Sequence, residues 1–252
     1  MRRLCYLSVL LPALVWGDPP PISEDWGLGG PMLSVWEGDV ELGLLISSGN
    51  TNETTFVGEV DLTQELAAWR HRILLESRYT ENAKRTTAEN YSAASQVDYK
   101  LTDTDYVYAR WHYQDDRFSG FDYQASVIGG YGWRFWQQGE RFLDLSAGLG
   151  YRVRQLKEPD PDNDIDEEEP IARLAASLEY PISENASFEQ ETSTELTLDN
   201  YETVTESESS LKANLNDSLA LKVSYSIEHD SNVPKDTKNT DTLTSLTVLY
   251  QF

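Results

Sequence analysis

Acidic and basic side chains recur at alternate positions in many short segments of this 252-residue sequence, and they form two groups along the chain. Alternate positions share one face of a β-strand, so each group would form a charged surface. Facing surfaces of opposite sign can pair with each other, or they can line a passage whose field selects ions. The acidic group contains Glu41, Glu59, Asp61, Glu189, Glu191, Glu195, Glu206 and Glu208. The basic group contains Arg72, Arg110, Arg134, Arg152 and Arg154.

Histidine could supply acid–base chemistry, but His71, His112 and His229 are far apart in the sequence. A serine hydrolase would need a serine and an orienting polar group beside one of them. Ser77 shares a strand face with His71, yet the intervening strand separates the two by ~20 Å. No histidine- or cysteine-based metal pattern is present. The sequence therefore predicts no catalytic residue, no metal site and no cofactor, although a partner for His71 on a neighbouring strand stays open.

An acidic run that begins at Asp160 invites comparison with a calcium-binding loop. Asp160, Asp162 and Asp164 match the first ligand positions of an EF-hand. Ile165 stands where the tight-turn glycine belongs, and Ile171 stands where the bidentate glutamate belongs. We therefore predict a solvated acidic loop, because runs of like charge repel each other. A looser divalent-ion site that bridges to lipopolysaccharide phosphates is the alternative.

Period-two alternation of apolar and polar residues positions these charges and continues to the end of the chain. It predicts twelve strands separated by turn residues. The segments are 36–46, 56–66, 69–79, 91–101, 107–113, 123–135, 143–153, 174–180, 188–198, 206–215, 219–227 and 246–252. The last segment ends on Tyr250 and Phe252, which resembles the C-terminal signal of bacterial outer-membrane barrels. The pattern therefore predicts an all-β fold, an antiparallel transmembrane β-barrel of twelve strands.

The connections between these segments differ in length according to their order. Those after even-numbered segments are short, whereas most of those after odd-numbered segments are longer, as in residues 80–87 and 156–170. Only the turn at Asp199 and Asn200 departs from this rule. Short turns at one end and long loops at the other are typical of outer-membrane barrels and not of β-sandwiches. Inward glycines, at positions 43, 130, 132, 148 and 150, would either leave space for a channel or ease strand bending.

The N-terminal residues precede the strand pattern and read as a targeting segment. Arg2 and Arg3 come before a short apolar run, so residues 1–17 are predicted to be a secretory signal peptide. Residues 18–34 are rich in proline and glycine and are predicted to be a periplasmic arm, followed by the barrel in residues 35–252. The sole cysteine, Cys5, lies in the signal peptide, so the mature chain would have no disulfide.

The composition limits the classes of partner. Acidic residues outnumber basic ones by 43 to 20, which gives a formal net charge of -23. Binding to nucleic acid requires clusters of lysine and arginine, so this class of function is excluded. A barrel tolerates such a charge because its interior and its loops can hold many charged groups.

The first predicted strand and its loop carry a specific pattern. They read GDVELGL at residues 38–44 and SSGNT at residues 47–51, and later segments read DDRF at 115–118, GGYGW at 129–133 and AGLGY at 147–151. With the C-terminal Phe252, these runs resemble the YdiY-like family of salt-induced outer-membrane proteins, whose function is unknown. The resemblance covers residues 36–252. It implies an outer-membrane barrel and supplies no catalytic residue.

Together these features predict an exported, non-enzymatic barrel in the bacterial outer membrane, linked to salt or osmotic stress. It would act as a narrow solute or ion passage or as a structural component of the envelope. The expected partners are outer-membrane lipid, lipopolysaccharide and the barrel assembly machinery, which would read Tyr250 and Phe252. An outer-membrane lipid hydrolase and a soluble exported β-sandwich that binds a ligand are the alternatives. The oligomeric state stays open.

Overall fold

Alternation of apolar and polar residues produces long antiparallel strands. The computed structural model describes residues 36–47, 53–82, 85–138, 141–157, 166–232 and 239–252, and these ranges contain twelve β-strands. The strands are β1 (Trp36–Ser47), β2 (Glu53–Glu65), β3 (Trp69–Asn82), β4 (Arg85–Lys100), β5 (Asp105–Asp116), β6 (Phe121–Gln138), β7 (Arg141–Leu156), β8 (Asp166–Ser183), β9 (Ala186–Thr197), β10 (Thr203–Asn214), β11 (Leu219–Asp230) and β12 (Thr240–Gln251).

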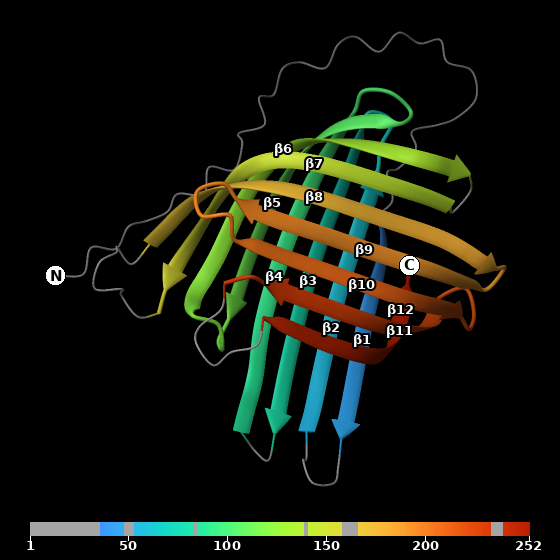
Figure 1. Ribbon diagram of the computed structural model, residues 1–252. Helices are drawn as coiled ribbons and strands as arrows, with labels where there is room; N and C mark the ends of the chain where they lie inside the picture. The colour runs from blue at the N-terminus through green and yellow to red at the C-terminus, as the bar shows by residue number, and fades with distance from the viewer. Residues whose placement is uncertain (1–35, 48–52, 83–84, 139–140, 158–165, 233–238) are drawn as a thin grey trace, which may run out of the picture. The chain divides into compact units, whose positions relative to one another are not determined.

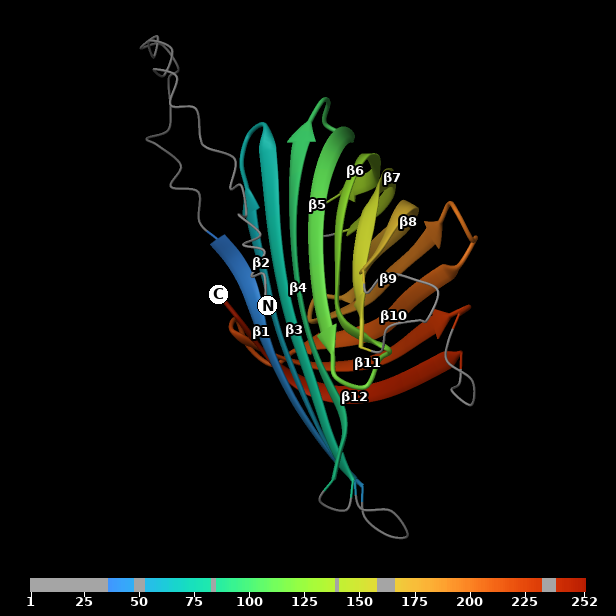
Figure 2. The ribbon, with the colours of Figure 1, turned by 90° about the vertical axis from the view of Figure 1, so that its left-hand side faces the viewer.

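Each strand pairs antiparallel with its neighbours in the sequence, and β1 pairs with β12, so the sheet closes into a barrel (Figures 1 and 2). At this closing seam Val40 lies opposite Tyr250. Gly38 and Phe252 exchange two backbone hydrogen bonds of 3.0 Å. Closure removes the unpaired strand edges that an open sheet would expose. The predicted twelve-stranded antiparallel barrel is confirmed, and the β-sandwich alternative is wrong for the described residues.

The two faces of the barrel wall differ in polarity, as the alternation predicts. Large apolar side chains on the outward face are exposed, for example Leu44 at 60% and Leu174 at 64%. Polar side chains on the inward face are largely shielded, for example Glu41 and Thr247. Among the described residues, no helix is both long and apolar enough to cross a membrane.

Several strands extend further than the sequence pattern indicates. Residues 80–87 do not form a long loop, because β3 continues to Asn82 and β4 begins at Arg85. The acidic run after position 160 is also not entirely a loop, since β8 begins at Asp166 and pairs with β7. The prediction of a solvated loop is therefore wrong for Glu167 and Glu169, because both face arginines of β7. Asp160, Asp162 and Asp164 lie outside the described residues.

One side of the barrel interior is filled by aromatic and aliphatic side chains. Tyr106 and Tyr108 of β5 pack with Ile128 of β6 and Ile171 of β8. The tyrosine rings lie over the inward glycines of β6 and β7, where an added β-carbon would overlap them: Tyr106 covers Gly132, and Tyr108 covers Gly130 and Gly148. These three glycines therefore leave space for tyrosines and not for a channel, whereas Gly43 lies against Thr247 and Gly150 against Ile128. We call these four side chains and the three glycines the packed region.

The predictions for the N-terminal residues stay predictions. The proposed signal peptide in residues 1–17 and the arm in residues 18–34 lie outside the described residues.

Candidate functional site

A polar cavity of about 740 Å³ lies inside the barrel beside the packed region. Side chains from strands around the barrel line it, and among the described residues the lining contains sixteen Asp or Glu and eight Lys or Arg side chains. Strand alternation explains this composition, because β1, β2, β9 and β10 each carry at least two acidic residues at inward positions. The cavity is the candidate site.

The residues predicted from sequence occupy three environments. Most of them line the main cavity: Glu41, Glu59, Asp61, Glu189, Glu191, Glu206, Glu208, Arg72, Arg110 and Arg134. Glu195 and Arg152 line a smaller adjacent cavity of about 70 Å³. Arg154 is buried among carboxylates and lines neither cavity. The last two arginines therefore belong to a shielded cluster and not to the main lumen.

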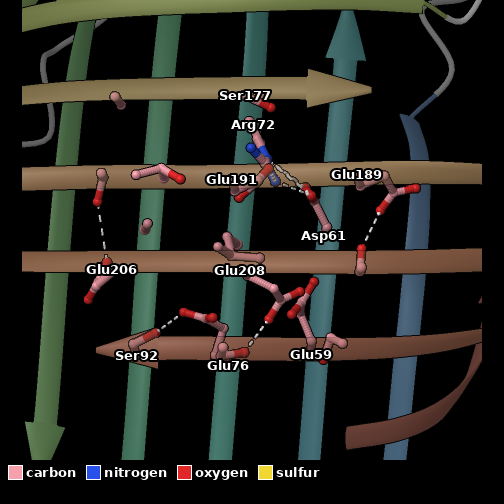
Figure 3. A pocket seen from close by; sticks show the side chains of 18 of the residues that line it. Glu59, Asp61, Arg72, Glu76, Ser92, Ser177, Glu189, Glu191, Glu206 and Glu208 are labelled. Atoms are coloured by element: carbon pink, nitrogen blue, oxygen red, sulfur yellow. Dashed lines mark hydrogen bonds and ion pairs between the residues drawn. The ribbon is translucent and has the colours of Figure 1, made fainter. Parts of the chain in front are cut away.

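Arg72 on β3 crosses the lumen. Its Nη2 atom lies 3.0 Å from Oε1 of Glu191 on β9 (Figure 3). The same Nη2 atom lies 2.7 Å from Oδ2 of Asp61 on the adjacent strand β2, and Nε of Arg72 also donates to that carboxylate. We call Arg72 and Glu191 the transluminal pair, and Asp61 its anchor. Strand patterning placed all three inward but could not show that Arg72 contacts the opposite wall.

The acidic wall contains an embedded cation that the predicted groups omitted. Lys222 on β11 places its Nζ atom 3.0 Å from Glu41 and 3.0 Å from Glu208. Thr247 donates a hydrogen bond of 2.5 Å to the other carboxylate oxygen of Glu41. The alternation of β11 identifies Lys222 as inward, and this is the signal that could have included it. The acidic wall is therefore partly neutralised from within.

The basic wall likewise contains carboxylates. Arg70 lies 2.5 Å from Asp98 and 3.5 Å from Asp144. Asp144 also lies 2.9 Å from Arg134 and accepts a hydrogen bond from the hydroxyl of Tyr106. Burial of charge is tolerated when each group is paired in this way. Each wall therefore contains both positive and negative side chains. The acidic wall has a net negative charge, because more of its carboxylates have no basic partner.

A second charged cluster lies apart from the main cavity. Arg152 on β7 lies 2.9 Å from Glu169 on β8, and Arg154 contacts the other oxygen of that carboxylate at 2.9 Å. Glu167 and Glu202 also contact Arg154. Here the side chains are almost completely shielded, with Arg152 6% and Glu169 10% exposed. This cluster joins β7, β8 and the β9–β10 connection and is structural in character.

The histidines form no catalytic arrangement among the described residues. His112 lines the main cavity, and Nδ1 of His229 lies 2.8 Å from the hydroxyl of Thr240. In the strands as described, no serine hydroxyl hydrogen-bonds to His71. Within the same ranges there is no group of histidine and carboxylate side chains arranged to hold a metal ion.

Fold and interior together define a closed twelve-stranded β-barrel with a cavity lined by charged and polar side chains. The chain belongs to the family described as "Protein of unknown function, DUF481", which matches residues 40–252. It is 25% identical over 218 residues to "Uncharacterized protein YdiY" of Escherichia coli strain K12, covering 85% of this chain and 82% of that protein. The resemblance to the YdiY-like family is thereby confirmed.

Solved structures with a similar fold include outer-membrane proteins. The NanC porin in its rhombohedral crystal form has a TM-score of 0.50 and 14% identity, covering 85% of this chain and 97% of that chain. The translocator domain of the autotransporter NalP from Neisseria meningitidis has a TM-score of 0.47 and 12% identity, covering 86% of this chain and 87% of that chain. At 14% identity, the likeness to the NanC porin extends to the fold alone.

Proposed function

We propose that the protein is a non-enzymatic β-barrel of the bacterial outer membrane that forms a narrow, charge-lined passage for small solutes or ions. The polar cavity enclosed by the strands is the observation that carries this proposal. A closed barrel satisfies the backbone hydrogen bonds of every strand, as lipid requires. The exposed apolar side chains of the outward face would contact the acyl chains. The similarity in fold to a porin supports the same assignment.

The passage should prefer cations. Carboxylates are twice as numerous as basic groups in the cavity lining, and several of them, such as Glu37 and Glu206, have no ion-pair partner within 4.0 Å among the described residues. Rings of carboxylates in a pore attract cations and repel anions. Small hydrated inorganic cations and small cationic organic solutes are therefore the expected class of permeant species.

Conductance in planar bilayers tests this function. The refolded full-length mature protein should give discrete current steps, and a salt gradient across the bilayer should give a reversal potential of the sign expected for cation preference. A protein that shows the gel mobility of a folded barrel but produces no current above background would overturn the passage.

Residues 1–17 would direct export, and the C-terminal strand would direct assembly. The rings of Tyr250 and Phe252 stack with their centroids 6.1 Å apart at the closing seam. Such a strand end suits recognition by the barrel assembly machinery, and lipid and lipopolysaccharide would surround the assembled barrel. Phe252→Ala should lower the fraction of protein that shows heat-modifiable mobility in membranes. Unchanged assembly would contradict the assembly role of Phe252.

A structural role in the envelope is the second candidate, and the packed region with its shielded ion pairs favours it. A link to salt or osmotic stress completes the proposal and rests on the family resemblance. Deletion of the gene should then impair growth at raised osmolarity, whereas equal growth of the deletion and parent strains would contradict that link.

A further inference from the structure

We infer that the ion pair between Arg72 and Glu191 is an openable barrier that sets the width of the passage. This inference rests on the proposed function and identifies the residues that form the narrowest part of the passage. In the closed order of twelve described strands, β3 and β9 are six strands apart in either direction. Arg72 and Glu191 therefore join opposite sides of the barrel at 3.0 Å, from positions 119 residues apart.

The two ends of this contact are held differently. Arg72 forms three hydrogen bonds with Asp61 on the neighbouring strand, which fix the guanidinium against its own wall and direct it inward. Paired contacts of this kind between guanidinium and carboxylate groups are geometrically restrictive. Glu191 contributes one hydrogen bond to Arg72. The contact across the lumen is therefore the part that can separate while Asp61 keeps Arg72 in place.

The barrier also separates two unlike parts of the interior. Arg70, the preceding inward residue on β3, reaches Asp144 on β7 and lies with its guanidinium carbon 5.0 Å from the ring centroid of Tyr106. That side merges with the packed region. Figure 3 shows Glu59 and Glu208 on the opposite side of Arg72 from Ser177, and all three of these residues line the main cavity. Separation of Arg72 from Glu191 would widen this cavity.

Water reaches both members of the pair. The Arg72 side chain is 39% exposed and that of Glu191 is 49% exposed, whereas Arg152 and Glu169 are shielded. An exposed ion pair contributes little to stability because water competes for both charges. The contact can therefore open without unfolding the barrel. Hydrated inorganic cations would pass beside the closed pair, and larger cationic solutes would require it to open.

Single-channel recording of R72Q tests this inference, with R110Q as the matched control. Both variants remove one positive charge from the lining, but Arg110 has no ion pair within 4.0 Å among the described residues. We expect R72Q to conduct more than both the wild type and R110Q, and to admit larger cations. Equal conductance of all three would overturn the barrier and leave the passage intact. Absence of current from all three would overturn both.

Cross-linking provides a readout that does not depend on current. The mature chain contains no cysteine, so R72C/E191C introduces two defined thiols. A bifunctional thiol reagent long enough to bridge the gap left by the two shortened side chains should join them in the folded barrel, shift the mobility of the denatured protein and reduce the conductance of the double variant. R72C and E191C alone should show neither effect. Failure of the reagent to join the thiols in a folded double variant would contradict the contact across the lumen.

Discussion

The packed region and the open cavity lie in one barrel and follow one pattern of alternation, yet they differ in what the inward positions carry. In the packed region, tyrosine rings cover glycines, and Ile171 is fully buried. In the open cavity, inward glutamates and serines lie around the transluminal pair. Large rings opposite small residues fill space at the density of a protein core. Charged side chains keep water near them, because desolvation without full pairing is costly.

Charged side chains lie both in the shielded cluster around Glu169 and in the open cavity, so charge alone does not distinguish the two. They differ in how completely each charged side chain is paired with one of opposite sign. The shielded cluster around Glu169 contains charges that contact each other from several directions. The carboxylates that line the main cavity outnumber the basic side chains there by two to one. Four substitutions test the distinction, and their expected effects on stability decrease in the order given.

Glu169→Ala should produce the largest loss of stability. It leaves Arg152 and Arg154 without their shared carboxylate in a shielded environment. We expect the free energy of unfolding to fall by about 3 kcal/mol, the lower end of the range for a broken buried pair, because Glu167 and Glu202 still contact Arg154. Urea unfolding in detergent, followed by gel mobility, measures this. The exposed Arg117–Glu89 pair supplies the control, since Glu89→Gln should cost less than about 1 kcal/mol.

Gly130→Ala should come next. A β-carbon there would overlap the ring of Tyr108 and the carbonyl oxygen of Ala147. Overpacking of this kind costs about 1–3 kcal/mol, because the ring or the strand must move. The same unfolding assay applies, and Gly120→Ala is the control, since nothing lies within 4 Å of its added β-carbon. Equal stability of the two variants would show that the tyrosine rings do not fill the space beside these glycines.

Arg72→Gln should have a small effect on stability although it changes conductance. Both side chains of the pair are partly exposed, so the free energy of unfolding should change by less than about 1 kcal/mol. A loss as large as that of Glu169→Ala would show that the transluminal pair is structural, and the contrast between the two regions would fail.

Glu59→Gln should change stability least and alter selectivity. Glu59 lines the open cavity and has no ion pair within 4.0 Å among the described residues. Its neutralisation should lower the cation preference measured as a reversal potential, with stability within about 0.5 kcal/mol of the wild type. Asp217→Asn removes the same charge from an exposed turn between β10 and β11 and should leave selectivity unchanged. Identical selectivity of both variants would remove Glu59 from the passage.

The strands were predictable from sequence because alternation is a local signal. Even segment 206–215, whose apolar residues are only Leu211, Ala213 and Leu215, corresponds to β10. The ends of the strands were less predictable. The acidic start of β8 was predicted to be a loop, but the register of β8 with β7 places Glu169 beside Arg152. Charge repulsion within a segment was visible in the sequence, but compensation by an adjacent strand was not.

The candidate site was predictable only in its composition. Alternation identified Arg72 and Glu191 as inward, whereas their contact depends on the curvature of the whole barrel. Tyr108 also fell on the polar face of the predicted segment 107–113, but its position over Gly130 depends on strand register, and Tyr106 lay outside that segment. Contacts between strands that are distant in the sequence require the closed geometry, which no local pattern contains.

Thiol accessibility along β8 tests the central claim most directly, that one part of the interior is hydrated and the other is packed. Ser177 lines the open cavity and Ile171 lies in the packed region, both on the inward face of the same strand. In a chain that lacks residues 1–17 and therefore contains no other cysteine, Ser177→Cys should react with a membrane-impermeant cationic thiol reagent while the barrel stays folded. Ile171→Cys should stay unmodified until the protein is denatured. Equal reaction rates at the two positions in the folded barrel would contradict the account.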